Sequence, residues 1–213
     1  MDLNKRLTLV SVVGAAGKMG SGITLLVAQE MARLSLLPEN KDTTFRLIAM
    51  DLDAAALRGL QEYVHTQALK ASEKQAVGLR GLYAEHTNLV ENGEIIEDFT
   101  RRVTSMVWPT TDLASVKDSK LVFEAIVEKI DIKTAVYKQL KELCPEAYFF
   151  TNTSSVPISL IDEQAGLDGR VVGFHFYNPP PVQKLVEVIR GKNTTDDVAA
   201  VADEVGKRLR KKL

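Results

Sequence analysis

A group of glycines at the junction of a strand and a helix constrains the fold of this chain more than any other feature. Residues 7–13 form a short β-branched segment typical of a buried strand, and apolar side chains recur at helical spacing from Ile23 onward. Gly14, Gly17 and Gly20 lie between them. In a dinucleotide-binding fold, small residues here allow a tight turn, close approach of the backbone to a pyrophosphate and close helix packing. The turn therefore predicts a nucleotide site at the start of the following helix.

The spacing of this turn departs from the usual pattern. It reads G-x-x-G-x-x-G, one residue longer than G-x-G-x-x-G, and an ordinary glycine turn without a ligand is the alternative. Lys18 suggests a triphosphate-binding loop, but Met19 follows it where Ser or Thr would bind magnesium. We therefore exclude nucleotide triphosphate chemistry, and assign Lys18 and Met19 to the cofactor site together with the three glycines.

An acidic residue supports a dinucleotide site. Asp51 ends the second predicted strand, residues 45–50, where a carboxylate can accept hydrogen bonds from a ribose diol and would repel a 2′-phosphate. The interval from Gly20 to Asp51 is longer than the usual one of about 20 residues, and a polar insertion at residues 38–44 accounts for the difference. Since no arginine stands beside Asp51, NAD is preferred over NADP.

Strand-like and helical segments alternate along the rest of the chain. A helical pattern covers residues 54–96 with a break near Asn92 and Gly93. The other predicted elements are strands at 102–107, 120–126, 148–151, 171–177 and 183–189, and helices at 133–143, 158–165 and 196–209. This order predicts a Rossmann-like, doubly wound α/β fold with a mainly parallel sheet. A long helical insertion follows the second strand, and antiparallel strands stand near the end.

Composition excludes several classes of protein. Of 213 residues, 45% are hydrophobic and 26% charged, and the net charge of −1 supplies no overall field for nucleic acid or an anionic membrane. The single Cys144 allows neither an internal disulfide nor a cysteine metal cluster, and suits a reducing compartment. No apolar stretch approaches the ~18 residues that span a bilayer. We expect a cytoplasmic protein with no metal, nucleic-acid or membrane partner.

A histidine inside an apolar segment is the next candidate for a functional residue. His175 stands in GFHFYN, where an ionisable group needs a partner or a purpose. If the strands on either side of the prolines at 179–181 pair in antiparallel fashion, Glu187 lies opposite His175. An imidazole held by a carboxylate is the usual arrangement of a general base, and a structural ion pair is the alternative. His65 and His86 fall in a polar helical region and are expected at the surface.

A cluster of short polar side chains, TNTSS at residues 151–155, follows another predicted strand. Its hydroxyl and amide groups could hold a substrate oxygen beside the base. The same segment could cap a helix, which the nearby Pro157 supports. One segment can do both.

Together these segments resemble the NAD-binding domain of L-3-hydroxyacyl-CoA dehydrogenases. The similarity runs from residue 9 to residue 207, and the intervals from Ser154 to His175 and from His175 to Glu187 equal those of the family. It rests on the glycine turn at 14–22, LVFEAIVEKIDIK at 121–133, NTSSVPI at 152–158, GFHFYNPPPVQKLVE at 173–187 and VGK at 205–207.

The resemblance implies hydride transfer between the C3 hydroxyl carbon of a 3-hydroxyacyl-CoA and NAD, in fatty-acid oxidation or its reverse. His175 would be the general base, Glu187 would orient it, and Ser154 would hydrogen-bond the substrate oxygen. Asn178 would lie near the nicotinamide, while Glu128 and Lys133 match positions that contact cofactor or substrate. The positions that match the dinucleotide site are Gly14, Gly17, Gly20 and Asp51.

The largest departure from the family is an absence. Its members continue into a helical domain that carries a substrate-orienting asparagine and most of the dimer interface, whereas this sequence stops at Leu213. We expect a dinucleotide-binding domain at residues 1–206 and a basic stub at 207–213, with homodimerisation of the full-length protein through the absent domain. This chain alone is expected to bind NADH but to turn over hydroxyacyl-CoA poorly. The alternatives are a dehydrogenase of a 3-hydroxy acid without CoA and a catalytically idle dinucleotide-binding module.

Overall fold

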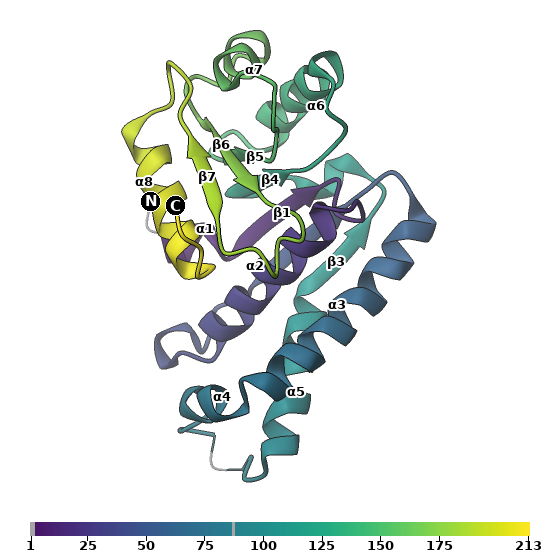
Figure 1. The fold of residues 1–213 in the computed structure, drawn as a ribbon, viewed down its shortest axis with the longest axis vertical. Coiled ribbons are helices and arrows are strands. Elements are labelled where there is room, and N and C mark those ends of the chain that lie inside the picture. Colours follow the sequence, from purple (N-terminus) through teal and green to yellow (C-terminus); the bar gives the residue numbers. More distant parts are fainter. Residues whose placement is uncertain (1–2, 87) are drawn as a thin grey trace.

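In the computed structural model, which describes residues 3–86 and 88–213, a seven-stranded sheet lies between two layers of helices (Figure 1). The strands are β1 (Leu9–Val13), β2 (Arg46–Met50), β3 (Val107–Thr110), β4 (Leu121–Glu124), β5 (Tyr148–Thr151), β6 (Val171–Phe176) and β7 (Val186–Ile189). The helices are α1 (Leu3–Arg6), α2 (Gly20–Ser35), α3 (Ala54–Lys74), α4 (Ala76–Leu82), α5 (Asn92–Met106), α6 (Ile130–Leu143), α7 (Ile158–Ala165) and α8 (Asp196–Arg208), with 3-10 turns η1 (Pro38–Asn40) and η2 (Leu113–Val116).

The strand order confirms the predicted fold. It is β3-β2-β1-β4-β5-β6-β7, with parallel pairing up to β6 and an antiparallel β7 at the edge. This is the doubly wound arrangement, in which ligands bind outside the carboxyl ends of the strands, at the point where the strand order reverses. Here that point lies between β1 and β4.

Side chains alternate between the two faces of the sheet, and each face has its own apolar core. Val10 and Val12 of β1 are fully buried in the core that α2 and α8 cover, whereas Val13 packs with Tyr137 and Leu140 of α6 on the other face. Burial of each such side chain contributes roughly 1.5–3 kcal/mol. The sheet is therefore a rigid support for residues at the ends of its strands. No helix among the described residues is long and apolar enough to cross a membrane.

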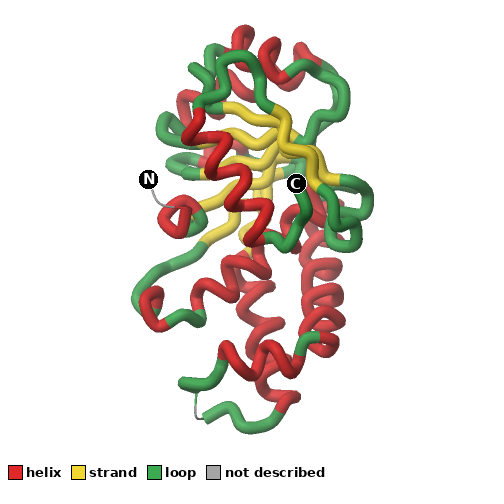
Figure 2. Tube along the Cα trace, turned by 60° about the vertical axis from the view of Figure 1, so that its left-hand side comes forward, coloured by secondary structure: helices red, strands yellow, loops and turns green. Residues whose placement is uncertain are grey.

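The insertion after β2 is an arm of helices that extends beyond the sheet (Figures 1 and 2). The long helices α3 and α5 pack side by side, and α4 lies near the tip. The arm confirms the helical insertion and a break close to the predicted position, since α4 ends at Leu82 and α5 begins at Asn92; Asn92 and Gly93 themselves belong to the helix. Asn92 begins α5, because Glu91 and Glu94 form a capping box in which the Glu94 carboxylate accepts the Glu91 N–H at 2.9 Å. The break lies before Asn92, in the segment that connects α4 to α5.

The predicted strand at residues 102–107 is wrong for all but its last residue. The helix α5 continues to Met106, and β3 begins directly at Val107. Ile95, Phe99 and Val103 follow helical spacing and are buried within the arm. Their packing outweighs the strand preference of the β-branched residues near the end of α5, because tertiary burial routinely overrides local propensity.

Candidate active site

The glycine turn is closed by the end of the neighbouring strand. The N–H groups of Gly14 and Ala15 donate to the Met50 carbonyl at 2.9 and 3.0 Å, and the Ala16 N–H donates to the Asp51 carboxylate at 2.9 Å. The turn and the acidic residue predicted to share a nucleotide site are thus in direct contact at the carboxyl ends of β1 and β2.

Two of the three glycines are required by the geometry of the turn. Gly14 has a φ of +82°, and a Cβ there would lie 2.7 Å from the Ala125 carbonyl oxygen. A Cβ on Gly20 would lie 1.9 Å from the Gly14 carbonyl oxygen, whereas one on Gly17 would be 3.3 Å from the same atom. The start of α2 therefore lies close against the end of β1, and Gly17 has more room than the other two.

The N-terminus of α2 offers a place for an anion. Met19, which precedes the helix, makes no capping hydrogen bond through its side chain, and Lys18 before it is exposed. Free backbone N–H groups and the positive end of the helix dipole favour a negative charge at such a terminus. The residues present therefore fit a dinucleotide, with its pyrophosphate on α2 and a ribose diol beside Asp51.

His175 and Glu187 meet across the antiparallel pair at the edge of the sheet. The register pairs them directly, and His175 Nδ1 lies 2.8 Å from Glu187 Oε2. This confirms the pairing predicted from the sequence. The neighbours Phe174 and Phe176 point into the core that α2 and α8 cover, so the alternation of the strand turns the imidazole towards the opposite face.

The hydrogen bond to Glu187 determines which nitrogen of His175 is free to act as a base. Because the carboxylate can only accept, the neutral ring donates through Nδ1 and keeps an unprotonated Nε2. The hydrogen bond from His175, followed by one from Tyr177, lowers the pKa of Glu187 below its ordinary value. The carboxylate thus stays ionised at neutral pH and can stabilise an imidazolium.

Glu128 holds the polar segment that follows β5. Its Oε1 accepts the Thr153 hydroxyl at 2.6 Å and the N–H groups of Ser154 and Ser155 at 2.8 and 3.0 Å. Burial alone would raise the pKa of Glu128, but the hydrogen bonds from Thr153 and Ser154 and the charge of Lys133 outweigh it and lower the pKa to about 2. The segment is therefore fixed by an ionised carboxylate.

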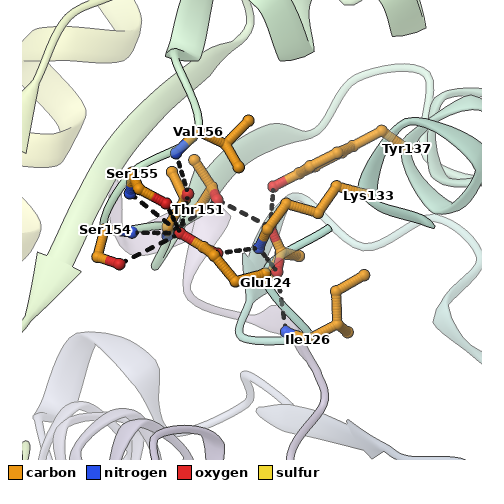
Figure 3. A network of polar contacts seen from close by, with 10 residues as sticks. Glu124, Ile126, Lys133, Tyr137, Thr151, Ser154, Ser155 and Val156 are labelled. Carbon is orange, nitrogen blue, oxygen red and sulfur yellow. Dashed lines mark hydrogen bonds and ion pairs between the residues drawn. The ribbon is translucent and has the colours of Figure 1, made fainter. Parts of the chain in front are cut away.

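A second carboxylate lies behind this segment (Figure 3). Glu124, the last residue of β4, is fully buried and accepts hydrogen bonds from four donors. These are the Ile126 N–H at 2.8 Å, Lys133 Nζ at 2.7 Å, the Tyr137 hydroxyl at 3.2 Å and the Thr151 hydroxyl at 2.8 Å. Lys133 also lies 3.2 Å from Glu128 Oε2, so one ammonium joins the two carboxylates.

A cavity of about 300 Å³ brings the predicted residues together. Ser154 and His175 both line it, and the Asn152 side chain joins their segments by accepting the Phe176 N–H at 2.8 Å. Met19 of the glycine turn forms part of its wall. The remaining lining residues are Ala125, Ile126, Glu128, Phe176, Tyr177 and Asn178. Two larger hollows, at the C-terminal tail and between α3 and α5, contain neither Ser154 nor His175.

Some predicted site residues do not line this cavity. Gly14, Gly17, Lys18, Gly20 and Asp51 lie along the turn instead, and Glu187 stands behind His175. Lys133 is only 1% exposed and lies behind Glu128.

Glu124 was missed by the sequence analysis. A signal for the residue itself was available, because Glu124 is an ionisable group inside an apolar segment, as His175 is, whereas its partners could not be read from the sequence.

Comparison with known proteins shows the family of the chain. The family described as "3-hydroxyacyl-CoA dehydrogenase, NAD binding domain" matches residues 9–213. A probable 3-hydroxybutyryl-CoA dehydrogenase of Deinococcus radiodurans is 34% identical over 158 residues, covering 74% of this chain and 55% of that protein. A protein of the same description from Bacillus subtilis is 32% identical over 201 residues, covering 92% and 59%.

A solved structure gives the same result. The crystal structure of 3-hydroxybutyryl-CoA dehydrogenase from Escherichia coli K12 aligns with a TM-score of 0.74 at 28% identity, covering 97% of this chain and 37% of that one. The chain thus spans a little over half the length of the two curated relatives described above.

Proposed function

Since the chain belongs to the family of NAD-binding domains of 3-hydroxyacyl-CoA dehydrogenases, we propose that the protein oxidises the C3 hydroxyl of a 3-hydroxyacyl-CoA, or catalyses the reverse reaction, in fatty-acid metabolism. The cofactor of the family is NAD, which accepts the hydride from C3 when bound. The observation that carries the proposal is the shared cavity, whose wall contains His175, Ser154 and Met19 of the glycine turn.

His175 is proposed as the general base. Its Nε2 takes the proton of the substrate hydroxyl, and Glu187 stabilises the resulting imidazolium through Nδ1. The Ser154 hydroxyl, which lies 3.3 Å from Glu128 Oε1 in the free chain, would turn from that carboxylate and hydrogen-bond the substrate oxygen. In the reverse direction the same imidazolium returns the proton to the oxygen.

The proposed cofactor contacts lie on the turn and at the near end of the cavity. Gly14, Gly17, Lys18, Met19 and Gly20 would hold the pyrophosphate at the start of α2. Asp51 would accept a ribose diol, and Glu128 and Asn178 would meet the nicotinamide half of the cofactor at the cavity wall. Lys133 would act from behind, through Glu128.

The proposal is tested with the 213-residue chain and NADH. We expect calorimetry to show NADH binding, and a single-turnover mixture with acetoacetyl-CoA to oxidise the bound NADH slowly. Free acetoacetate is the matched substrate control. Equal rates with both substrates would favour a dehydrogenase of 3-hydroxy acids without CoA. NADH binding with no oxidation by either substrate would leave an idle dinucleotide-binding module.

Three broader proposals accompany this function. The greater length of the relatives supports a dinucleotide-binding domain at residues 1–206 and a basic segment at 207–213 that leads into a further helical domain. We propose that the complete protein forms a homodimer through that domain, which light scattering of the full-length protein would test.

A cytoplasmic location is proposed from the lone Cys144, which is buried and forms no disulfide. Cell fractionation would test it.

A further inference from the structure

Glu124 is a buried acidic residue for which the proposed reaction has no direct use. It is completely inaccessible to solvent and does not line the cavity, so it can touch neither cofactor nor substrate. A buried carboxylate is costly unless its oxygens are fully hydrogen-bonded. Its presence at the end of β4 therefore requires a structural or functional reason.

The hydrogen bonds of Glu124 show that it acts as an acceptor only. Oε1 receives the Ile126 N–H and the Lys133 ammonium, and Oε2 receives the hydroxyls of Tyr137 and Thr151. Four donors fill the four accepting positions of an ionised carboxylate. These donors come from the loop after β4, from α6 and from β5, so Glu124 fixes three neighbouring elements to one point.

Lys133 connects Glu124 to Glu128, which lines the cavity. The Lys133 side chain is 1% exposed, and its ammonium lies 2.7 Å from Glu124 Oε1 (Figure 3). The same ammonium lies 3.2 Å from Glu128 Oε2. A buried ammonium cannot turn to solvent, so its position is set by these two carboxylates. With Glu124 ionised, the lysine is shared, and Glu128 Oε1 remains free to accept the donors of the serine segment.

The serine segment depends on Glu128 for its position. The Ser154 N–H and Ser155 N–H donate to Oε1, and the Ser154 hydroxyl lies 3.3 Å from the same oxygen. The sequence of contacts therefore runs without a gap from Glu124, through Lys133 and Glu128, to the hydroxyl that faces the cavity.

We propose that Glu124 is a positioning residue that sets the place of the Ser154 hydroxyl by holding Lys133 between two carboxylates. The inference rests on the proposed function for its catalytic meaning, but the mechanical coupling is a property of the chain alone. Without the Glu124 charge, the buried ammonium has one anionic partner left and moves onto Glu128. It then competes with the serine donors for that carboxylate.

Hydrogen exchange of the Glu124→Gln variant tests the coupling without cofactor or substrate. Glutamine has the same shape, and its amide can donate to the Tyr137 and Thr151 hydroxyls while accepting from Ile126. We expect the Ser154 and Ser155 amides to exchange about tenfold faster, since their hydrogen bonds to the charged Glu128 carboxylate are weakened when Lys133 competes for it. The amides of β4 and β5 should keep their wild-type rates.

Asp162→Asn is the matched control. Asp162 is another buried carboxylate, 4% exposed, and it accepts the Gly169 N–H at 2.9 Å and the Asn193 side chain at 3.1 Å, away from the cavity. This variant should leave the serine amides unchanged. Acceleration of the serine amides in the control would overturn the proposal, as would unchanged or uniformly faster exchange in Glu124→Gln.

A second variant covers the case in which Glu124→Gln does not fold. Glu124→Asp keeps the charge but shortens the side chain by one methylene, so it cannot hold Lys133 and Thr151 at once. We expect the same selective acceleration at Ser154 and Ser155, smaller in size. Wild-type exchange at both amides would count against the proposal.

Activity separates the inference from the proposed function. In protein that oxidises NADH, Glu124→Gln should lower the rate of hydride transfer about tenfold with less than a twofold change in NADH affinity. In a Ser154→Ala background the same substitution should have no further effect, because the two residues act through one hydroxyl. Additive losses would overturn the positioning role. A wild-type chain that binds no NADH would instead refute the proposed function, and the exchange experiment would still decide the coupling.

Discussion

Two buried carboxylates with similar partners lie in different regions of this molecule, one in the sheet and one in the arm. Glu124 accepts a tyrosine hydroxyl and a lysine ammonium at the end of β4, and Asp98 in the arm accepts the Tyr83 hydroxyl at 2.8 Å and Arg102 Nε at 2.6 Å. Both clusters join an acid to a phenol and to a basic side chain, and Asp98 has Arg101 as a second basic partner. Hydrogen bonds from Arg102 and Tyr83 lower the pKa of Asp98 even though its burial acts in the opposite direction.

The two clusters differ in the structural elements that supply the partners of each carboxylate. The arginine partners of Asp98 stand on its own helix, and Tyr83 joins α5 only to the end of α4, so the cluster is confined to the arm. The partners of Glu124 come from successive strands and helices whose ends meet at one edge of the sheet. The same chemistry therefore joins two helices in the arm and, beside the cavity, joins the loop after β4 to α6 and β5. The two clusters differ because of the position of each carboxylate in the fold, and not because of the types of residue that surround it.

The largest difference in hydride-transfer rate between a variant of the site and a variant of the arm should come from His175→Ala. Loss of a general base costs typically 10²–10⁴-fold in rate, so we expect hydride transfer to fall by about 1,000-fold. NADH affinity and the free energy of unfolding should change little, because the ring is at the edge of the sheet. His65 is an exposed residue of the arm, so His65→Ala is the control and should leave the rate of hydride transfer unchanged. Undiminished turnover in His175→Ala would remove the role assigned to the histidine.

The arm should show the opposite behaviour. Asp98→Asn removes the negative charge and one of the two acceptor oxygens that serve two arginines and a tyrosine. Breaking a buried pair costs on the order of 3 kcal/mol, and this cost is reduced here because Arg101 is exposed. We expect urea unfolding to show a loss of about 2 kcal/mol, with NADH affinity unchanged. A clear loss of NADH affinity in the folded variant would show that the arm and the site are coupled, contrary to the comparison.

A smaller effect on binding alone is expected from Asp51→Asn. The amide keeps an oxygen for the Ala16 N–H but loses the charge that favours a ribose diol and repels a 2′-phosphate. NADH affinity should fall about tenfold, in line with the roughly 1.5–3 kcal/mol of a charge-assisted hydrogen bond. Calorimetry with NADH and NADPH checks this, since the preference between them should narrow. An unchanged preference would place the ribose elsewhere.

The smallest effect concerns acid stability. The pKa of Glu128 is about 2 in the folded chain against 4.5 unfolded, so its contribution is present above pH 4.5 and is lost as the pH falls towards 2. The stability difference between wild type and Glu128→Gln should therefore shrink between about pH 5 and about pH 3. Since the side chain is 35% exposed, we expect less than about 1 kcal/mol. A constant difference across this range would contradict the lowered pKa.

The sequence predicted those parts of the site that local patterns specify. The glycine turn and Asp51 follow from residue type at strand ends, and the pairing of His175 with Glu187 follows from the register of one hairpin. The Glu124 cluster was not predictable in this way, because its partners come from three separate elements. The limits of α5 were missed for a related reason, since burial in the arm overrides the strand preference of its last turn.

The most direct test of the account is a map of amide protection in the 213-residue chain upon NADH binding. We expect protection at the glycine turn, residues 14–20, and at residues 126–128 beside the cavity, with residues 76–106 of the arm unchanged. Protection confined to the hollow between α3 and α5, or absent from the glycine turn at saturating NADH, would contradict the assignment of the site to the carboxyl ends of the strands.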